Sequence, residues 1–178
     1  MKLAQRLRRF VRARKGLAAL EFAIIAPMMI FLLFGSVDLL DVLTANKRVQ
    51  NAAASIADVV ARDTEVSNSE VSGLWAALDV LMFPDEGANV NMRISSITIQ
   101  NSTTARVVWS EGQGMAPRVA NSTVTLPAAM MTPGTSIIMT ESTYEYRSPL
   151  GFLLPGPVTI RHDAYRRSRL VDPIPRVP

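Results

Sequence analysis

Few residues of this sequence have the type and spacing that catalysis or metal binding requires. Cysteine is absent from the 178 residues, which excludes disulfides, thiolate chemistry and cysteine-based zinc sites. His162 is the only histidine, and its place in an alternating pattern favours a surface or structural residue over a ligand. Glu141 and Glu145 would share one strand face. Paired carboxylates can exchange protons, but two exposed glutamates on a strand are usually just solvated.

The glycine-rich motifs do not predict a nucleotide site. Gly112-Gln113-Gly114 lacks the strand-then-helix setting of a dinucleotide fingerprint, and the GxxxxGK[ST] phosphate loop is absent. The sequence therefore predicts no enzyme activity, no cofactor and no metal.

A cluster of arginines close to the C-terminus is the remaining group of charged side chains that could act together: Arg161, Arg166, Arg167 and Arg169. One interpretation is an electrostatic docking patch for an acidic partner subunit. The other, which is the more common situation for such residues, is a solvated strand end.

One acidic residue, Glu21, lies inside a long apolar stretch that runs from Leu17 to Val37. As a helix, this stretch would span the roughly 30 Å hydrocarbon core of a bilayer. Its apolar residues surround the whole helix, which disfavours a buried helix of a soluble protein. Glu21 would lie about one turn inside the membrane boundary, where it could reach the headgroups or pair with another subunit. Pro27 predicts a kink, which membrane helices tolerate.

The charges on either side of this stretch predict its orientation. Seven of the 19 Lys and Arg residues lie within residues 1–16, which hold no acidic residue. The other 12 are outnumbered by 15 acidic residues, so the rest of the chain carries a net charge of −3. The positive-inside rule places the N-terminus in the cytoplasm. The folded part has no basic excess, which argues against binding to nucleic acid.

A cleaved secretory signal peptide is the main rival to a permanent membrane helix. Signal peptidase requires small residues soon after the apolar core. Here Val37 is followed by Asp38-Leu39-Leu40-Asp41, which lacks such a site.

The segment Gly16-Leu17-Ala18-Ala19-Leu20-Glu21-Phe22 looks like the cleavage site of a type IV prepilin. More specifically, residues 16–40 resemble the N-terminal signature of the TadE-like family, through Gly16, Ala18-Ala19, Glu21-Phe22-Ala23, Pro27, Gly35 and Asp38. A weaker resemblance covers Tyr144 to Leu150 and Leu153 to Gly156. The chain is too short for the additional domain of the TadG-type relatives, which favours a TadE- or TadF-type minor pilin.

This resemblance implies a route of processing and assembly. A prepilin peptidase would cut after Gly16 and leave Leu17 as the new N-terminus. Glu21 would then accept the Leu17 ammonium of a neighbouring subunit, with Phe22 beside it. The implied partners are other minor pilins, the major pilin, the inner-membrane assembly platform and lipid. The implied location is the bacterial inner membrane, with a single membrane span and a periplasmic domain; incorporation into the extracellular pilus is left open.

The remaining sequence predicts an α+β fold. Apolar positions at steps of three and four continue the first helix to about Arg62: Leu39, Val42, Leu43, Val49, Ala53, Ile56 and Val60. A short second helix, capped by Ser67 or Asn68, would end at Pro84 to Gly87. An antiparallel sheet of about four strands would follow, with a bulge at Ser95-Ser96 and a hairpin loop at residues 101–104.

Residues 111–135 read as a long surface loop with a brief strand at 124–126, and its methionines suit either a contact surface or core filling. These patterns divide the chain into four predicted segments: a basic leader (1–16), a transmembrane helix (17–38), an extracytoplasmic α+β domain (39–172) and a proline-rich tail (173–178). We expect the tail to be extended and poorly ordered.

Three functions compete at this point. The first is a pseudopilin or minor pilin that initiates, primes or caps a tight-adherence pilus. The second is an uncleaved bitopic scaffold of a pilus or secretion complex, and the third is a membrane-tethered hydrolase. The cleavage pattern at residues 16–22 favours the first, and the missing catalytic groups argue against the third.

Overall fold

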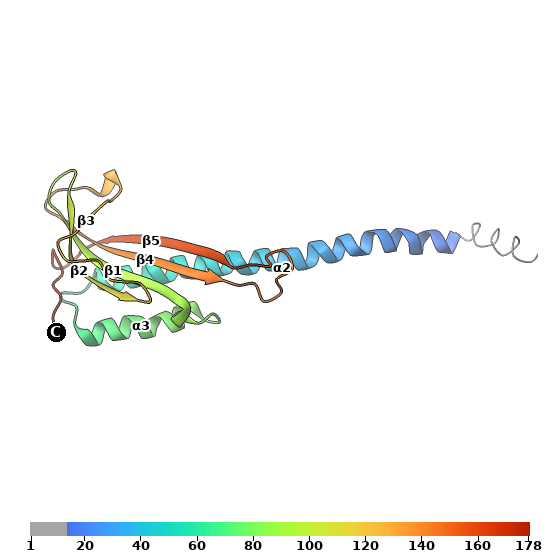
Figure 1. The fold of residues 1–178 in the computed structure, drawn as a ribbon, viewed down its shortest axis with the longest axis horizontal. Coiled ribbons are helices and arrows are strands. Elements are labelled where there is room, and N and C mark those ends of the chain that lie inside the picture. Colours follow the sequence, from blue (N-terminus) through green and yellow to red (C-terminus); the bar gives the residue numbers. More distant parts are fainter. Residues whose placement is uncertain (1–13) are drawn as a thin grey trace, which may run out of the picture.

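The computed structural model describes residues 14–178 and shows a long helix laid along an antiparallel sheet (Figure 1). Residues 1–13 of the predicted basic leader lie outside the described residues. The elements, in chain order, are α2 (Arg14–Val60), α3 (Asn68–Met82), η1 (Gly87–Asn89), β1 (Val90–Ile99), β2 (Ala105–Gln113), β3 (Thr123–Val124), η2 (Ala128–Met130), β4 (Ser136–Tyr146) and β5 (Val158–Arg167). The predicted α+β class is confirmed.

The sheet has five strands in the order β3-β2-β1-β4-β5, and every pair in it is antiparallel. The sheet has one strand more than the predicted four. The additional strand is the two-residue edge strand β3, which overlaps the brief strand predicted at residues 124–126. The predicted bulge is confirmed as a register shift between Ser96 and Ile97 in the β1–β2 pairing. The predicted hairpin loop joins these two strands, and the Asn101 side chain accepts a hydrogen bond from the Thr103 backbone N–H at 2.9 Å.

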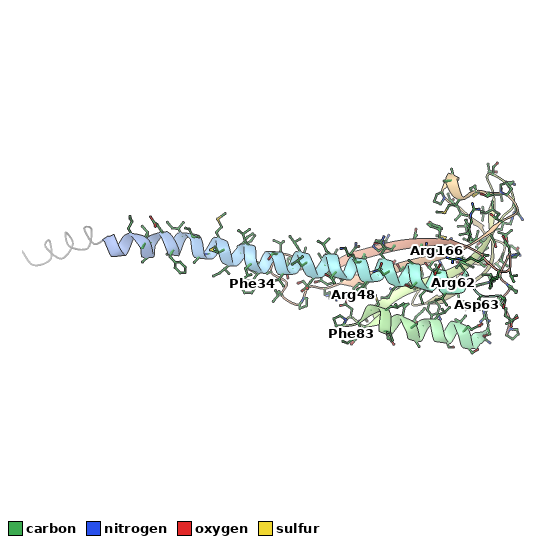
Figure 2. All side chains as sticks on the ribbon, turned by 180° about the vertical axis from the view of Figure 1, so that it is seen from behind. Phe34, Arg48, Arg62, Asp63, Phe83 and Arg166 are labelled. Carbon is green, nitrogen blue, oxygen red and sulfur yellow. The ribbon has the colours of Figure 1, made fainter. Side chains whose placement is uncertain are left out.

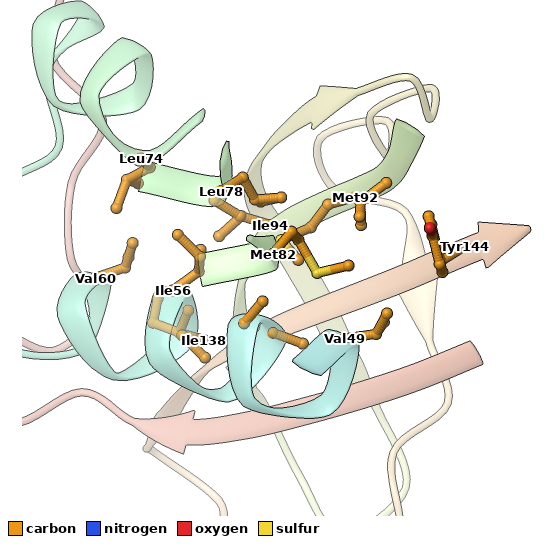
Figure 3. Close-up of a cluster of buried hydrophobic side chains, with 14 of the residues drawn as sticks. Val49, Ile56, Val60, Leu74, Leu78, Met82, Met92, Ile94, Ile138 and Tyr144 are labelled. Atoms are coloured by element: carbon orange, nitrogen blue, oxygen red, sulfur yellow. The ribbon is translucent and has the colours of Figure 1, made fainter. Parts of the chain in front are cut away.

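One face of the sheet, together with α2 and α3, encloses the main hydrophobic core (Figure 3). The largest contributors are buried side chains from all three layers: Val49, Ile56 and Val60 from α2, Leu74, Leu78 and Met82 from α3, and Met92, Ile94 and Ile138 from the sheet. Burying each of these side chains stabilises the fold by about 1.5–3 kcal/mol before the entropic cost is counted. The α2 residues of this core therefore bind the membrane-length helix firmly to the domain.

The helix α3 begins as the sequence predicts. The Ser67 hydroxyl accepts a hydrogen bond from the Glu70 backbone N–H at 3.3 Å, and the Glu70 carboxylate accepts one from the Ser67 N–H at 2.5 Å. This reciprocal pair satisfies two of the free N–H groups at the helix start. In α2, by contrast, Leu39 and Leu43 are exposed instead of facing the core.

The residues that do face the domain along α2 follow a different register from the one predicted for its middle part. They are Gly35, Asp38, Val42, Ala45, Val49, Ala52 and Ile56, which recur at steps of three and four. Small residues and one acidic residue occupy the first part of this seam. The larger residues Leu39 and Leu43 lie beside this seam and are exposed.

A second core lies toward the other end of the sheet, under the long loop between β2 and β4. It contains Ile97, Ile99, Val107, Ile137 and Met139, and Val124 and Leu126 from the loop cover it. Met130 and Met131 pack against it, which supports the core-filling interpretation of these two methionines.

The C-terminal tail contradicts the expectation of poor order. Ile174 is completely buried in the main core, and its carbonyl accepts a hydrogen bond from the Trp109 indole N–H at 2.8 Å. The Val66 N–H donates to the Pro175 carbonyl at 3.0 Å, and the Val177 N–H donates back to the Val66 carbonyl at 2.9 Å. The tail is thus paired with the segment between α2 and α3, and it closes the end of the domain that is farthest from the start of α2 (Figure 1).

Candidate functional site

The N-terminal part of α2 carries the predicted processing and assembly residues on one continuous helix. Gly16, Leu17, Glu21 and Phe22 all lie within it. The helix projects away from the domain here, and its side chains radiate without a covering layer of protein (Figure 2). Leu17 is 60% exposed and Phe22 is 71% exposed. Leu17 and Glu21 are four residues apart, so they lie on the same side of the helix.

The apolar stretch at the start of α2 is long enough to cross a membrane, and its most apolar part is not buried at all within the domain. A helix that is apolar on every side and uncovered by its own chain requires lipid or other apolar helices around it. This arrangement is compatible with a single-pass membrane protein. α2 continues through Pro27 without interruption.

A contact that the sequence analysis did not foresee joins this helix to the loop between β4 and β5. Asp38 is completely buried. Its carboxylate accepts a hydrogen bond from the Ser148 hydroxyl at 2.5 Å and another from the Leu153 backbone N–H at 2.6 Å. The Ser148 hydroxyl in turn accepts one from the Gly151 N–H at 3.2 Å. We call this arrangement of Asp38, Ser148, Gly151 and Leu153 the Asp38 latch.

Aromatic contacts extend the latch toward the N-terminus of α2. The ring centroid of Phe152 lies 5.5 Å from the ring centroid of Phe31 and 5.9 Å from that of Phe34, and both ring pairs are tilted. Leu153 packs over Gly35, where a β-carbon would lie 4.0 Å from its Cδ1 atom. The sequence held a signal for this contact, since Asp38 falls in the same three-four register as Gly35 and Val42. That register marks Asp38 as facing protein and not solvent.

The four predicted patch arginines do not form one free patch. Arg166 and Arg169 converge on Asp58 of α2, with nitrogen–oxygen distances of 3.8 Å and 2.6 Å, and Arg62 also pairs with this carboxylate. Figure 2 shows Arg62 and Arg166 at the same end of the domain. The hydrogen bond from Arg62 and the charges of the other two arginines lower the pKa of Asp58.

The other two arginines of the predicted patch lie elsewhere. Arg167 donates to the Thr132 hydroxyl at 2.9 Å. Arg161 is exposed on β5, opposite Thr143 of β4. Most of the cluster therefore serves contacts within the domain.

The two glutamates considered for acid–base chemistry have different roles. Glu141 is partly buried, and its carboxylate accepts paired hydrogen bonds from the guanidinium groups of Arg93 and Arg118 at 2.7–2.9 Å. Burial by itself would raise the pKa of Glu141, but these hydrogen bonds outweigh it and leave the pKa below its ordinary value. Glu145 is exposed, with Arg147 at 3.9 Å. Glu141 thus acts as a structural ion-pair centre.

The single histidine has a structural contact as well. The Nε2 atom of His162 lies 2.9 Å from the Asn46 side-chain oxygen on α2. Among residues 14–178, no group of three His, Asp or Glu side chains is placed to hold a metal ion. An open groove of about 530 Å³ between α2 and α3 is lined almost entirely by apolar side chains, including Val59, Leu74 and Leu81. Three polar residues, Ser55, Asp63 and Glu70, also line this groove. The Glu70 carboxylate already accepts a hydrogen bond from the Ser67 N–H in the cap of α3.

Comparison with protein families shows that residues 16–58 match the family described as TadE-like protein. The matched segment begins at Gly16 and covers nearly all of α2, including Glu21 and Asp38. The resemblance inferred from the residues is therefore confirmed over this segment. Searches of curated proteins and of solved structures gave no match.

Proposed function

We propose that this chain is a minor pilin or pseudopilin that takes part in initiating, priming or capping a tight-adherence, type IVc pilus. The observation that carries the proposal is the match of residues 16–58 to TadE-like proteins on a helix whose apolar surface its own chain leaves uncovered. A subunit that must exchange lipid for neighbouring helices needs such a surface, because extraction from the bilayer has to be compensated by equivalent apolar burial.

Processing follows from the position of Gly16 at the start of the matched segment. A prepilin peptidase on the cytoplasmic side would cleave between Gly16 and Leu17, which removes seven positive charges and leaves a chain with a net charge of −3. The helix itself would stay in the inner membrane, with the domain in the periplasm. The distribution of Lys and Arg before the helix supports this orientation.

Assembly would then use the new N-terminus. Leu17 gains an α-ammonium group on cleavage, and Glu21 of a neighbouring subunit would accept it in a medium of low dielectric constant. There each charge alone is costly, and the pair specifies register more than it adds stability. The exposure of Leu17, Glu21 and Phe22 leaves this side of α2 free for such a contact. Other minor pilins, the major pilin and the assembly platform are the proposed partners.

Intact-mass measurement of the membrane-extracted protein tests processing. With active peptidase co-expressed, we expect the mass to fall by residues 1–16, and Gly16→Ala should abolish that loss. Gly73→Ala is the matched control, because a β-carbon at Gly73 in α3 meets nothing within 4 Å. A full-length mass in the presence of active peptidase would refute processing and favour an uncleaved bitopic scaffold.

Glu21→Gln separates assembly from processing. The variant keeps the side-chain shape but cannot pair with an ammonium group as a carboxylate does. We expect cleavage to continue and the recovery of the protein with sheared pili to be lost, whereas the exposed control Glu145→Gln should be recovered normally. Normal recovery of Glu21→Gln would remove Glu21 from the assembly step.

A further inference from the structure

We infer that the loop between β4 and β5 inserts its apolar tip into the outer leaflet of the lipid bilayer, beside the transmembrane helix of the same chain. The tip is the segment Leu150 to Leu154, and its partner is the lipid acyl region. The inference rests on the membrane placement of α2 that the proposed function includes, and it does not depend on a role in a pilus.

The first observation is the composition and exposure of the tip. Leu150 is 49% exposed and Phe152 is 47% exposed, although both are large apolar residues. Leu153 and Leu154 follow them but are partly buried, Leu153 over Gly35 of α2 and Leu154 against the main core, so Leu150 and Phe152 form the exposed part of the tip. Isolated exposed leucines are common on protein surfaces, but a contiguous apolar tip marks a contact site.

The second observation is the level of the tip along α2. Phe152 packs on Phe31 and Phe34, which lie inside the apolar stretch and not beyond its end. The Asp38 latch holds the loop at this level. Figure 1 shows this loop lying against α2 farther toward the N-terminus of the helix than any strand of the sheet.

The length of the apolar part of α2 indicates how deep in the bilayer the loop tip lies. If the hydrocarbon core ended on the cytoplasmic side of the loop tip, only residues 17–30 would cross it. These residues extend about 21 Å at 1.5 Å per residue. The hydrocarbon core is about 30 Å thick. In the unprocessed, full-length chain, shifting the helix toward the periplasm to fill the core would draw the basic residues that precede Leu17 into the acyl region, at a cost of several kcal/mol for each charge. The arrangement that avoids both costs places Phe31, Phe34 and the loop tip within the outer leaflet.

The residues around the tip suit this depth. Arg147, at the base of the loop, is 74% exposed at its side chain, where it can reach lipid phosphates. Asp38 would be costly at the edge of the acyl region if it were unpaired. The Ser148 hydroxyl and the Leu153 N–H satisfy its carboxylate, so the latch allows the acidic residue to stay at this level.

The test is a site-directed spin-label measurement. Because the chain has no cysteine, an introduced cysteine is the single labelling site. Single variants Leu150→Cys, Met28→Cys and Val119→Cys of the full-length protein are labelled with a nitroxide. They are then reconstituted in vesicles of phosphatidylethanolamine and phosphatidylglycerol. Met28 lies in the apolar stretch, and Val119 is 76% exposed in the loop between β2 and β3 at the far end of the domain. Collision rates with oxygen, which concentrates in lipid, and with a nickel chelate, which stays in water, are compared.

We expect the oxygen-to-nickel ratio at Leu150 to be severalfold above that at Val119 and to approach that at Met28. A ratio at Leu150 equal to that at Val119, with a high ratio at Met28, would overturn the loop insertion while leaving the membrane helix in place. A label at Leu150 that neither reagent reaches would show protein instead of lipid around the tip, and would also overturn it. Low ratios at both Leu150 and Met28 would overturn the membrane placement and the loop insertion together.

Discussion

Replacing Ile174 with Ala tests the packed C-terminus most directly. The side chain of Ile174 is completely buried, and its removal leaves a cavity between the sheet and the segment that joins α2 to α3. Ile→Ala changes in cores cost about 2–5 kcal/mol, and the cost grows with the cavity that remains. The neighbouring Val66–Pro175 and Val66–Val177 backbone hydrogen bonds hold the tail in place and restrict its collapse into the space. We therefore expect a loss of about 3 kcal/mol.

The assay is urea unfolding of the full-length protein in a mild detergent, followed by tryptophan fluorescence. Trp109 is a suitable reporter, because its indole N–H donates to the Ile174 carbonyl and this backbone bond survives the substitution. Val171→Ala is the control, since Val171 is partly exposed and such changes usually alter stability by less than about 0.5 kcal/mol. Equal unfolding midpoints for the two variants would refute the packing of the tail and favour a poorly ordered tail.

Three further predictions concern local contacts, each measured by the same unfolding assay. Ser67→Ala should cost about 1 kcal/mol by removing the cap of α3, and an unchanged midpoint would argue against the capping box. Glu141 has a pKa below its ordinary value in the folded state. Its contribution to the free energy of unfolding should therefore be complete above about pH 4.3 and be lost as the pH falls through the lowered pKa. Glu141→Gln should remove that part of the pH dependence, and an identical profile for the variant would contradict this role. Gly151 has a φ of +59°, so Gly151→Ala should cost about 1 kcal/mol; Gly156→Ala, where a β-carbon meets nothing within 4 Å, should cost little.

The parts of the fold that the sequence predicted depend on local signals. The cap of α3 was predicted as Ser67 or Asn68, and it is Ser67, the residue immediately before the helix. The bulge at Ser96 is visible as a change of phase in the alternating pattern, and the hairpin loop as a run of turn-forming residues. Helix boundaries, strands and turns of this kind are encoded over a few neighbouring positions, so one chain is enough to find them.

The parts that the sequence did not predict are contacts between distant positions. Asp38 and Ser148 are 110 residues apart, and Trp109 is 65 residues from Ile174. Periodicity shows that a residue faces the protein, but it does not show which partner the residue meets. The proline content of the tail led to a wrong prediction, because prolines favour an extended chain that lacks hydrogen-bonded partners. They are in fact compatible with a segment that pairs through Pro175 and Val177 along one neighbour.

Under the proposed function, the Asp38 latch also bears on how the chain would leave the membrane. The core residues on α2, the latch and the contacts of Phe152 with Phe31 and Phe34 together join the domain to the helix. Extraction would therefore move the helix and the loop tip together. If the tip lies in lipid, withdrawal exposes its apolar side chains in addition to those of residues 17–37, at roughly 25 cal/mol for each Å². A neighbouring subunit in a pilus would have to cover both surfaces. The loop thus adds to the contact area that a partner must supply, and a fibre that did not cover the tip would leave this subunit at the membrane, at the base of the assembly.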